Sequence, residues 1–182
     1  MEYRIVVLPK LDNQDELQLL RERHDPWFYQ LQPYITIIPS LNPATLDQLE
    51  EITAYLSRVR RNQPPVVVRA YNCVERDDRL VCPIQQGREE LIALHNRLSG
   101  AVPGSLLPDE DLFEPALVVA RVPDPEQRLE ALHEVNLLGR TIGLIDALSL
   151  VALEEAGRFR LVAGYPFGIG RVDYFDLSGG SE

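Results

Sequence analysis

The sequence contains no long hydrophobic run and lacks the common motifs of catalytic and cofactor-binding sites. None of its apolar stretches approaches the ~20 residues that span a membrane, and Met1 to Arg4 begin a strand rather than a leader peptide. We therefore expect a soluble, cytoplasmic protein with no membrane partner. A glycine-rich phosphate loop, a nucleophile elbow and a zinc-type cluster of Cys and His are also missing. Accordingly, we predict neither a metal site nor a cofactor.

Basic residues are outnumbered by acidic ones. The chain has 18 Lys and Arg against 28 Asp and Glu, a net charge of −10 and a pI near 4.8. This charge repels a polyanion at long range, so extended nucleic-acid binding is not expected. A small pocket that binds one phosphate is compatible with it. With 182 residues and 45% hydrophobic content, we predict a single domain over residues 1–177 and a disordered tail over 178–182.

Two stretches resemble each other and predict an internal duplication. Pro33–Ile38 (PYITII) and Pro115–Ala120 (PALVVA) each place a proline before an apolar run that is typical of a buried strand. Each is followed by a helix start in which an N-cap residue precedes proline, Asn42-Pro43 and Asp124-Pro125. Both features recur at one offset, since 116 − 34 = 82 and 124 − 42 = 82. The chain is therefore expected to fold as two similar halves.

The same two stretches resemble a known family. They are similar to the signature strands of the two-histidine phosphoesterase superfamily, which includes 2'-5' RNA ligase-like proteins and cyclic nucleotide phosphodiesterases and in which each strand reads Pro-His-hydrophobic-Thr. The segments Arg23–Pro26 and Leu94–Leu98 are also similar to family segments upstream of each motif. The resemblance covers about residues 4 to 168. It implies an α+β, bilobal, pseudo-two-fold fold in which each lobe is a mainly antiparallel sheet with outer helices, and in which a central cleft is lined by the signature strands.

This chain departs from the family motif at three of its four functional positions. Tyr34 and Ala116 stand where the two histidines belong, and Val118 stands where the second threonine belongs, whereas Thr36 matches the motif. The resemblance therefore predicts a degenerate member that is catalytically inactive by the family mechanism. One hypothesis is that the cleft still binds a small phosphorylated or nucleotide ligand through Thr36 and Tyr34. The alternative is a non-enzymatic scaffold or protein-interaction module with an apolar cleft.

Residue spacing predicts the other elements. Asn13 and Glu16 predict a capping box for a helix that runs to about His24. Further helices are expected over about 44–61, with a solvated basic end at Arg58, Arg60 and Arg61, over about 88–98, and after Asp124-Pro125. Residues 100–114 predict a surface loop, and 142–154 and 159–167 predict two more strands. The apolar stripes of the second and last helices are Leu46, Leu49, Ile52, Leu56 and Val59, and Leu129, Leu132 and Val135.

The three histidines, His24, His95 and His133, all fall on predicted helices. We considered His24 as a displaced catalytic base, but a partly buried histidine in the last turn of a helix, where the helix dipole favours the cation, explains it more simply. His95 is expected to pack beside its helix's apolar stripe. His133 has no metal partner at usable spacing.

A hairpin is predicted from residues 66–75 and 80–85 around Asp77-Asp78. If it turns symmetrically, paired residues sum to 155, which makes Cys73 and Cys82 direct neighbours with Cα atoms roughly 4.5 to 5.5 Å apart. The default in a cytoplasmic protein is two reduced thiols. Pro83 has no amide proton, so its strand is expected to be an edge strand or to carry a bulge there. The strand 34–39 should place Tyr34, Thr36 and Ile38 on one face.

Overall fold

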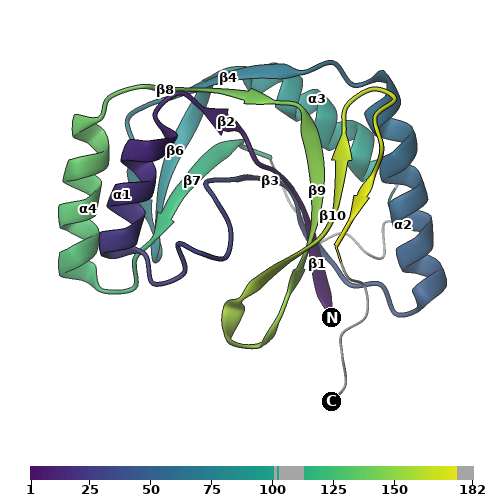
Figure 1. The fold of residues 1–182 in the computed structure, drawn as a ribbon, viewed down its shortest axis with the longest axis horizontal. Helices are drawn as coiled ribbons and strands as arrows, with labels where there is room; N and C mark the ends of the chain where they lie inside the picture. Colours follow the sequence, from purple (N-terminus) through teal and green to yellow (C-terminus); the bar gives the residue numbers. More distant parts are fainter. Residues whose placement is uncertain (101, 103–112, 176–182) are drawn as a thin grey trace.

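The computed structural model of the chain describes residues 1–100, 102 and 113–175. Most of the predicted loop 100–114 and the predicted tail 178–182 lie outside the described residues. Two antiparallel sheets form two lobes, and helices lie at their outer ends (Figure 1). The described segments also include the short 3-10 turns η1 (Arg60–Asn62) and η3 (Glu155–Gly157).

The first sheet has the strand order β11-β10-β9-β1-β3. Its strands are β1 (Glu2–Val7), β3 (Ile35–Leu41), β9 (Ala147–Leu153), β10 (Phe159–Pro166) and β11 (Asp173–Tyr174). The second sheet has the order β2-β8-β4-β6-β5, and β7 also pairs with β6. Its strands are β2 (Lys10–Leu11), β4 (Val66–Ala70), β5 (Val74–Arg76), β6 (Arg79–Gln86), β7 (Ala116–Arg121) and β8 (Thr141–Ile145).

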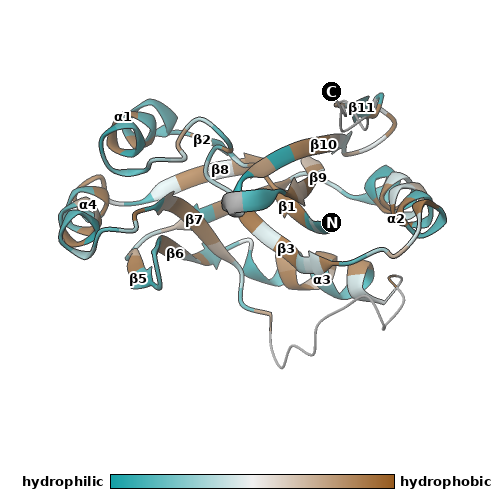
Figure 2. Ribbon diagram, turned by 90° about the horizontal axis from the view of Figure 1, so that it is seen from below, coloured by the Kyte–Doolittle hydropathy of each residue, from teal (hydrophilic) through white to brown (hydrophobic). Residues whose placement is uncertain are grey.

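The four α-helices of the described residues form two pairs. Helices α1 (Gln14–His24) and α4 (Pro125–Leu137) lie side by side at one end of the molecule, and α2 (Leu46–Val59) and α3 (Arg88–Ser99) lie at the other (Figure 1). Figure 2 shows that hydrophobic residues concentrate on the strands between the two pairs. The predicted α+β bilobal fold with outer helices is therefore confirmed.

Alternation along the strands separates two apolar clusters. Ile5 and Val7 of β1 belong to the large core cluster that also includes the buried leucines of α1 and α3, whereas Val6 belongs to a second, smaller cluster. The predicted alternation holds for Tyr34 through Ile37 but fails at Ile38, which lies in the large core. The cause is a register shift between β1 and β3, where Ile5 pairs with Ile38 and Val6 pairs with Thr36.

Several helix details differ from prediction. Asn13 makes no side-chain cap, and its side-chain Nδ2 donates to Thr141 Oγ1 at 2.9 Å. The second helix begins after Thr45, whose hydroxyl accepts from Gln48 N, so Asn42 is not its cap. Asp124 caps α4 as predicted, with Pro125 at the first helical position. The helix starts therefore do not share the offset that the strands show.

Three side chains have a different exposure from the one predicted. Leu46 and Leu129 are exposed rather than inward. Leu46 is the first residue of α2, and Leu129 lies on the opposite side of α4 from the buried Ala131 and Val135. Arg60 is buried rather than solvated. Its Nη1 donates to Pro166 O at 2.9 Å and to Gly170 O, so it ties the end of α2 to the segment after β10.

The predicted strand 142–154 is two strands in different sheets. Residues Thr141–Ile145 form β8 beside β4, and Ala147–Leu153 form β9 beside β1. The chain crosses between the lobes at Asp146, whose carboxylate accepts from Lys10. Strand β9 then pairs with β10 as a hairpin, as predicted.

The hairpin register around Asp77-Asp78 is confirmed. Val74 pairs with Val81, and Arg76 pairs with Arg79. Cys73 and Cys82 have Cα atoms 4.0 Å apart and form a disulfide, so the expectation of reduced thiols is wrong for this structure.

Pro83 does not lie in an edge strand, because β6 has β4 and β5 on one side and β7 on the other. It faces residues 71–73, which interrupt the β4–β5 arm, and the register of β4 against β6 shifts beside it, between Arg69–Gln86 and Ala70–Ile84. The bulge alternative therefore holds. Because residues 71–73 form no strand pair with Pro83, no carbonyl group on that side requires the amide proton that proline lacks.

Candidate functional site

The two signature strands meet at a single backbone bridge. Tyr34 N–H donates to Val118 O at 3.2 Å, and Val118 N–H donates to Tyr34 O at 2.8 Å. The bridge is antiparallel and joins the two sheets. A shift of 82 residues maps Tyr34 onto Ala116 and Thr36 onto Val118, so the bridge lies at the seam between the related strands. The predicted meeting of the two stretches is confirmed.

The side chains at the seam form the smaller apolar cluster. Its buried members are Val6, Leu31, Tyr34, Val81, Val118 and Val151, and Leu8, Ala116, Phe159 and Leu161 pack against it. Of the four motif positions, three therefore lie in or against apolar surroundings. Thr36 is half-buried. It is not among the described residues that line a cavity beside Tyr34.

Burial further favours the neutral form of the Tyr34 phenol. Desolvation raises the pKa of its phenol above the ordinary value of 10.0, although the nearby charges of Arg79, Arg4 and Arg121 act to lower it. The phenol is therefore protonated at neutral pH. It can donate a proton or a hydrogen bond, but it cannot serve as a general base.

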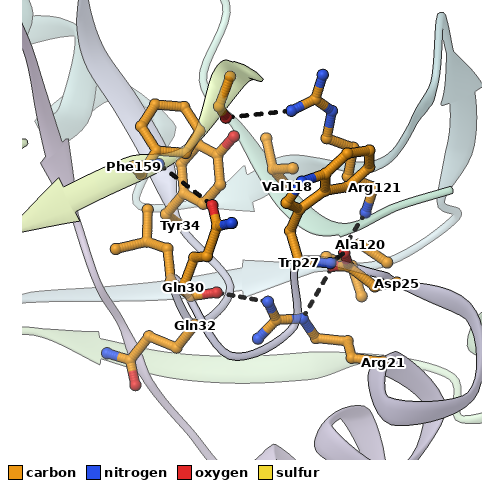
Figure 3. Close-up of a pocket in the computed structure, with 13 residues that line it drawn as sticks. Arg21, Asp25, Trp27, Gln30, Gln32, Tyr34, Val118, Ala120, Arg121 and Phe159 are labelled. Carbon is orange, nitrogen blue, oxygen red and sulfur yellow. Dashed lines mark hydrogen bonds and ion pairs between the residues drawn. The ribbon is translucent and has the colours of Figure 1, made fainter. Parts of the chain in front are cut away.

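A small cavity of about 30 Å³ lies beside Tyr34 (Figure 3). Its walls come from the segment between α1 and β3, from β7 and from the β9–β10 hairpin. The lining residues are Arg21, Asp25, Trp27, Gln30, Leu31, Gln32, Tyr34, Val118, Val119, Ala120, Arg121, Gly157 and Phe159. One water molecule needs ~10 to 15 Å³ of such volume. The cavity can therefore hold a group of a few atoms but not a whole nucleotide.

Asp25 organises the cavity wall. Its carboxylate accepts from Trp27 N at 2.8 Å, from Arg121 N at 3.2 Å and from Arg21 Nε at 3.4 Å. Figure 3 shows these groups converging from α1, the following loop and β7. Because Asp25 is itself buried, it fixes the position of this loop relative to the second signature strand.

Arg121 lies over the ring of Trp27, with Cζ 4.3 Å from the ring centroid. Its Nε donates to Asp78 Oδ2 at 2.6 Å, and its Nη1 donates to Gly157 O at 3.4 Å. Burial acts to raise the pKa of Asp78, but the hydrogen bond and charge of Arg121, the charge of Arg79 and a backbone hydrogen bond together outweigh it, and the net result is a lowered pKa. Arg121 is thus held as a fixed cation at the edge of the cavity.

The hairpin from β9 to β10 closes the other side. Phe159 N donates to Gln30 Oε1 at 3.2 Å, and its ring meets that of Tyr34 edge to face, with centroids 5.8 Å apart. Arg4 lies over the ring of Phe159, with Cζ 5.4 Å from the ring centroid. Its guanidinium also pairs with the carboxylate of Glu2. These contacts hold the hairpin against the seam.

The three histidines lie outside the seam. His24 is buried, and its Nε2 lies 3.1 Å from Glu134 Oε1 of α4. His95 Nδ1 lies 2.7 Å from Ile37 O, and its ring stacks on Phe113, which fits the predicted packing role. His133 is exposed on α4. None of the three lines the cavity beside Tyr34.

Two kinds of feature are absent from the described residues. Residues 1–100, 102 and 113–175 contain no group of three or more His, Cys, Asp or Glu side chains placed to hold a metal ion. In the same part of the chain, no helix is long and apolar enough to cross a membrane.

Sequence reasoning missed the residues that build the cavity. Arg21 lies on the buried side of α1, and Trp27 and Gln30 lie in the loop before the first signature strand. The run Trp27–Gln30 (WFYQ), which combines aromatic rings with an amide directly before that strand, was the available signal. The second available signal was Arg121, the last residue of the second signature strand.

Solved structures share this fold across nearly the whole chain. TT0787 of Thermus thermophilus is 16% identical, with a TM-score of 0.64, covering 92% of this chain and 98% of that one. LigT of E. coli in complex with 3'-AMP is 15% identical, with a TM-score of 0.61, covering 91% and 97%. Usb1 of Kluyveromyces marxianus is 12% identical, with a TM-score of 0.55, covering 91% and 98%. At these identities the likeness concerns the fold.

Among curated proteins, no sequence matches the chain. The model of the 2'-5' RNA ligase superfamily matches residues 9–157, which include both signature strands and the loop that carries Trp27 and Gln30. With this match and the shared fold, the chain belongs to the 2'-5' RNA ligase superfamily of two-histidine phosphoesterase-like proteins.

Proposed function

We propose that this protein has lost the two-histidine reaction of its family and binds a small phosphorylated or nucleotide ligand in the cleft. The observation that carries the proposal is the seam itself. Tyr34 and Val118 face each other in an apolar cluster, while the three arginines Arg4, Arg79 and Arg121 lie close enough to act on the pKa of Tyr34.

The loss of catalysis follows from the side chains at the motif positions. The family mechanism needs one group to accept a proton from the attacking oxygen and another to donate one to the leaving oxygen. Ala116 can do neither, and the raised pKa of Tyr34 leaves it only as a weak acid. Each proton-transfer partner typically contributes ~10² to 10⁴ in rate. Loss of both would therefore lower the rate by about 10⁴ to 10⁸ if their effects were independent.

Retained binding is supported by the local charge. The chain carries a net charge of −10, yet arginines gather at the seam, where they would attract an anion over a short range. LigT of E. coli has been solved with 3'-AMP, NADP+, phosphate and ATP. By analogy, we propose that the hydroxyl groups of Tyr34 and Thr36 donate hydrogen bonds to phosphate oxygens. The three arginines would supply the positive charge that attracts the phosphate.

The apolar cluster favours a second candidate function. Ala116 and Val118 present hydrocarbon where the family motif has histidine and threonine, and Val81 and Val151 extend the apolar cluster around them. A protein-interaction module with an apolar cleft would need no arginine cluster, and the response to ligands discriminates between the two functions.

A thermal-shift panel of 3'-AMP, 2',3'-cyclic AMP and inorganic phosphate tests binding. A ligand at 100 times its dissociation constant adds ~2.7 kcal/mol to the free energy of unfolding, which raises Tm by about 5 to 11 °C for a chain of this size. Thr36→Val should weaken the shift, and Thr53→Val, a matched change on the outer helix α2, should leave it intact. No shift with any member of the panel would favour the interaction module.

Hydrolysis of 2',3'-cyclic AMP tests the loss of catalysis. We expect the wild-type protein to show no turnover above buffer. The triple variant Y34H/A116H/V118T restores the family motif, and any gain in turnover would show that the backbone geometry at the seam has survived. Turnover by the wild-type protein that Thr36→Val abolishes would contradict the proposal.

A further inference from the structure

Arg21 is a buried cation with unused hydrogen-bonding capacity. Its side chain is 4% exposed. Nε donates to Asp25 Oδ2 at 3.4 Å, and Nη2 donates to Leu31 O. Nη1 is buried and has no hydrogen-bond partner among the described residues. Buried donors of this kind are rare in folded proteins, because leaving them unpaired loses their hydration without replacement.

A second unpaired donor lines the same cavity. Gln30 Oε1 accepts from Phe159 N at 3.2 Å, which fixes the orientation of the side-chain amide. Its Nε2 is then left buried without a partner in the described part of the chain. In Figure 3 this nitrogen points into the space between Tyr34 and Trp27. Arg21 and Gln30 both border the cavity of about 30 Å³.

We propose that this cavity is an oxyanion subsite in which Arg21 Nη1 and Gln30 Nε2 donate hydrogen bonds to a small anion or to the anionic oxygens of a larger ligand. The inference deepens the proposed function. It rests on that function where the anionic oxygens belong to a phosphorylated or nucleotide ligand, but not where the cavity binds a small free anion. It places an anionic group beside Tyr34, on the side of Trp27, in addition to the contact proposed at Thr36.

The chemistry of the wall selects an anion. Both unpaired groups are donors, so a cation or a donor ligand would leave them unsatisfied. Arg121 adds positive charge over Trp27. Asp25, the only carboxylate among the described residues that line the cavity, already accepts from three N–H groups. The volume is two to three times the ~10 to 15 Å³ that one water occupies. This suits a planar oxyanion such as formate or nitrate.

Thermal unfolding in sodium nitrate, formate and gluconate at one ionic strength tests the subsite, with gluconate as the anion too large to enter. At ten times its dissociation constant, nitrate should raise Tm by about 3 to 6 °C over gluconate. The variant Gln30→Glu keeps the acceptor for Phe159 N and replaces the unpaired nitrogen with an anionic oxygen. It should raise Tm in gluconate and abolish the nitrate response. Gln30→Met, which removes the donor without adding charge, should weaken the response without raising Tm in gluconate.

Two results would overturn the subsite. Equal Tm values in all three salts would mean that the cavity holds only water. An equal nitrate response in the wild-type protein and in both Gln30 variants would place the anion elsewhere.

An arm with 3'-AMP separates this inference from the proposed function. If 3'-AMP stabilises the wild-type protein but not Gln30→Glu, the phosphate of the ligand occupies the subsite. If 3'-AMP stabilises both equally, ligand binding stands and the subsite fails as a ligand contact. If nitrate shifts the wild-type protein and neither 3'-AMP, 2',3'-cyclic AMP nor inorganic phosphate does, the subsite serves a free anion and the proposed function fails.

Discussion

Replacement of Asp25 should be among the most destabilising single changes near the seam. The carboxylate is buried beside Arg21, and both side chains are 4% exposed. Burial lowers the pKa of Arg21, and the charge and hydrogen bond of Asp25 oppose that shift, so the guanidinium depends on this carboxylate. Asp25→Ala would leave a buried cation without its counter-ion and would also remove the acceptor for the amides of Trp27 and Arg121.

Loss of one partner from a buried ion pair typically lowers the free energy of unfolding by ~3 to 5 kcal/mol. For a chain of 182 residues, each kcal/mol corresponds to about 2 to 4 °C in Tm, so we expect Tm to fall by about 6 to 20 °C. Urea unfolding followed by far-UV circular dichroism measures the free energy directly. Glu154→Ala breaks a partly exposed pair with Arg160, and as a control it should cost less than about 1 kcal/mol.

A double variant tests the cause of this loss. R21M/D25N removes both charges and keeps an acceptor oxygen for one of the two amides, which in the wild-type protein donate to different carboxylate oxygens, so it should recover part of the stability that Asp25→Ala loses. If Asp25→Ala costs less than about 1 kcal/mol, or if the double variant is as unstable as the sum of its single changes, then the charge pair does not hold this loop and our reasoning fails.

Three further perturbations test other parts of the fold. A hydrogen bond from an arginine of α1 outweighs burial and holds the pKa of Glu134 below its ordinary value of 4.5. Its stabilising effect is therefore present above pH 4.5 and lost as the pH falls through the lowered pKa. The urea midpoints of the wild-type protein and Glu134→Gln should differ at pH 7 and converge once the pH is below the lowered pKa of Glu134. Reduction of Cys73–Cys82, which spans nine positions, should lower the free energy of unfolding by about 2 to 3 kcal/mol in paired urea curves with and without reductant; an unchanged midpoint would mean that the bond does not form in solution. Gly87→Ala would place Cβ 2.5 Å from a backbone oxygen of β4, whereas Gly139→Ala at a similar positive φ meets nothing within 4 Å. We expect the second to cost about 1 to 2 kcal/mol and the first clearly more, and equal melting temperatures for the two variants would refute the steric argument.

Local features of the chain were predictable from the sequence. The Asp124-Pro125 helix start, the apolar stripe of α3 and the hairpin around Asp77-Asp78 each depend on residues within a few positions of one another. Cap, period and turn preferences act over that range. The family motif located the seam because its two strands, which contain Tyr34 and Val118, are recognisable as short strings.

Long-range packing was decided only in three dimensions. Strand propensity cannot show that the chain leaves one sheet at Asp146, since β8 and β9 have the same apolar character. The burial of Arg60 depends on carbonyl groups more than 100 positions away.

The cavity beside Tyr34 has the same origin. It forms where α1, the loop after it, β7 and the β9–β10 hairpin meet, and Arg21 and Gln30 have unpaired donors only because those elements exclude water there. The sequence determined the Asp124-Pro125 helix start, the register of the hairpin around Asp77-Asp78 and the absence of the motif histidines. The tertiary structure alone decided which polar groups were buried together, because burial is set by neighbours that are distant in the chain.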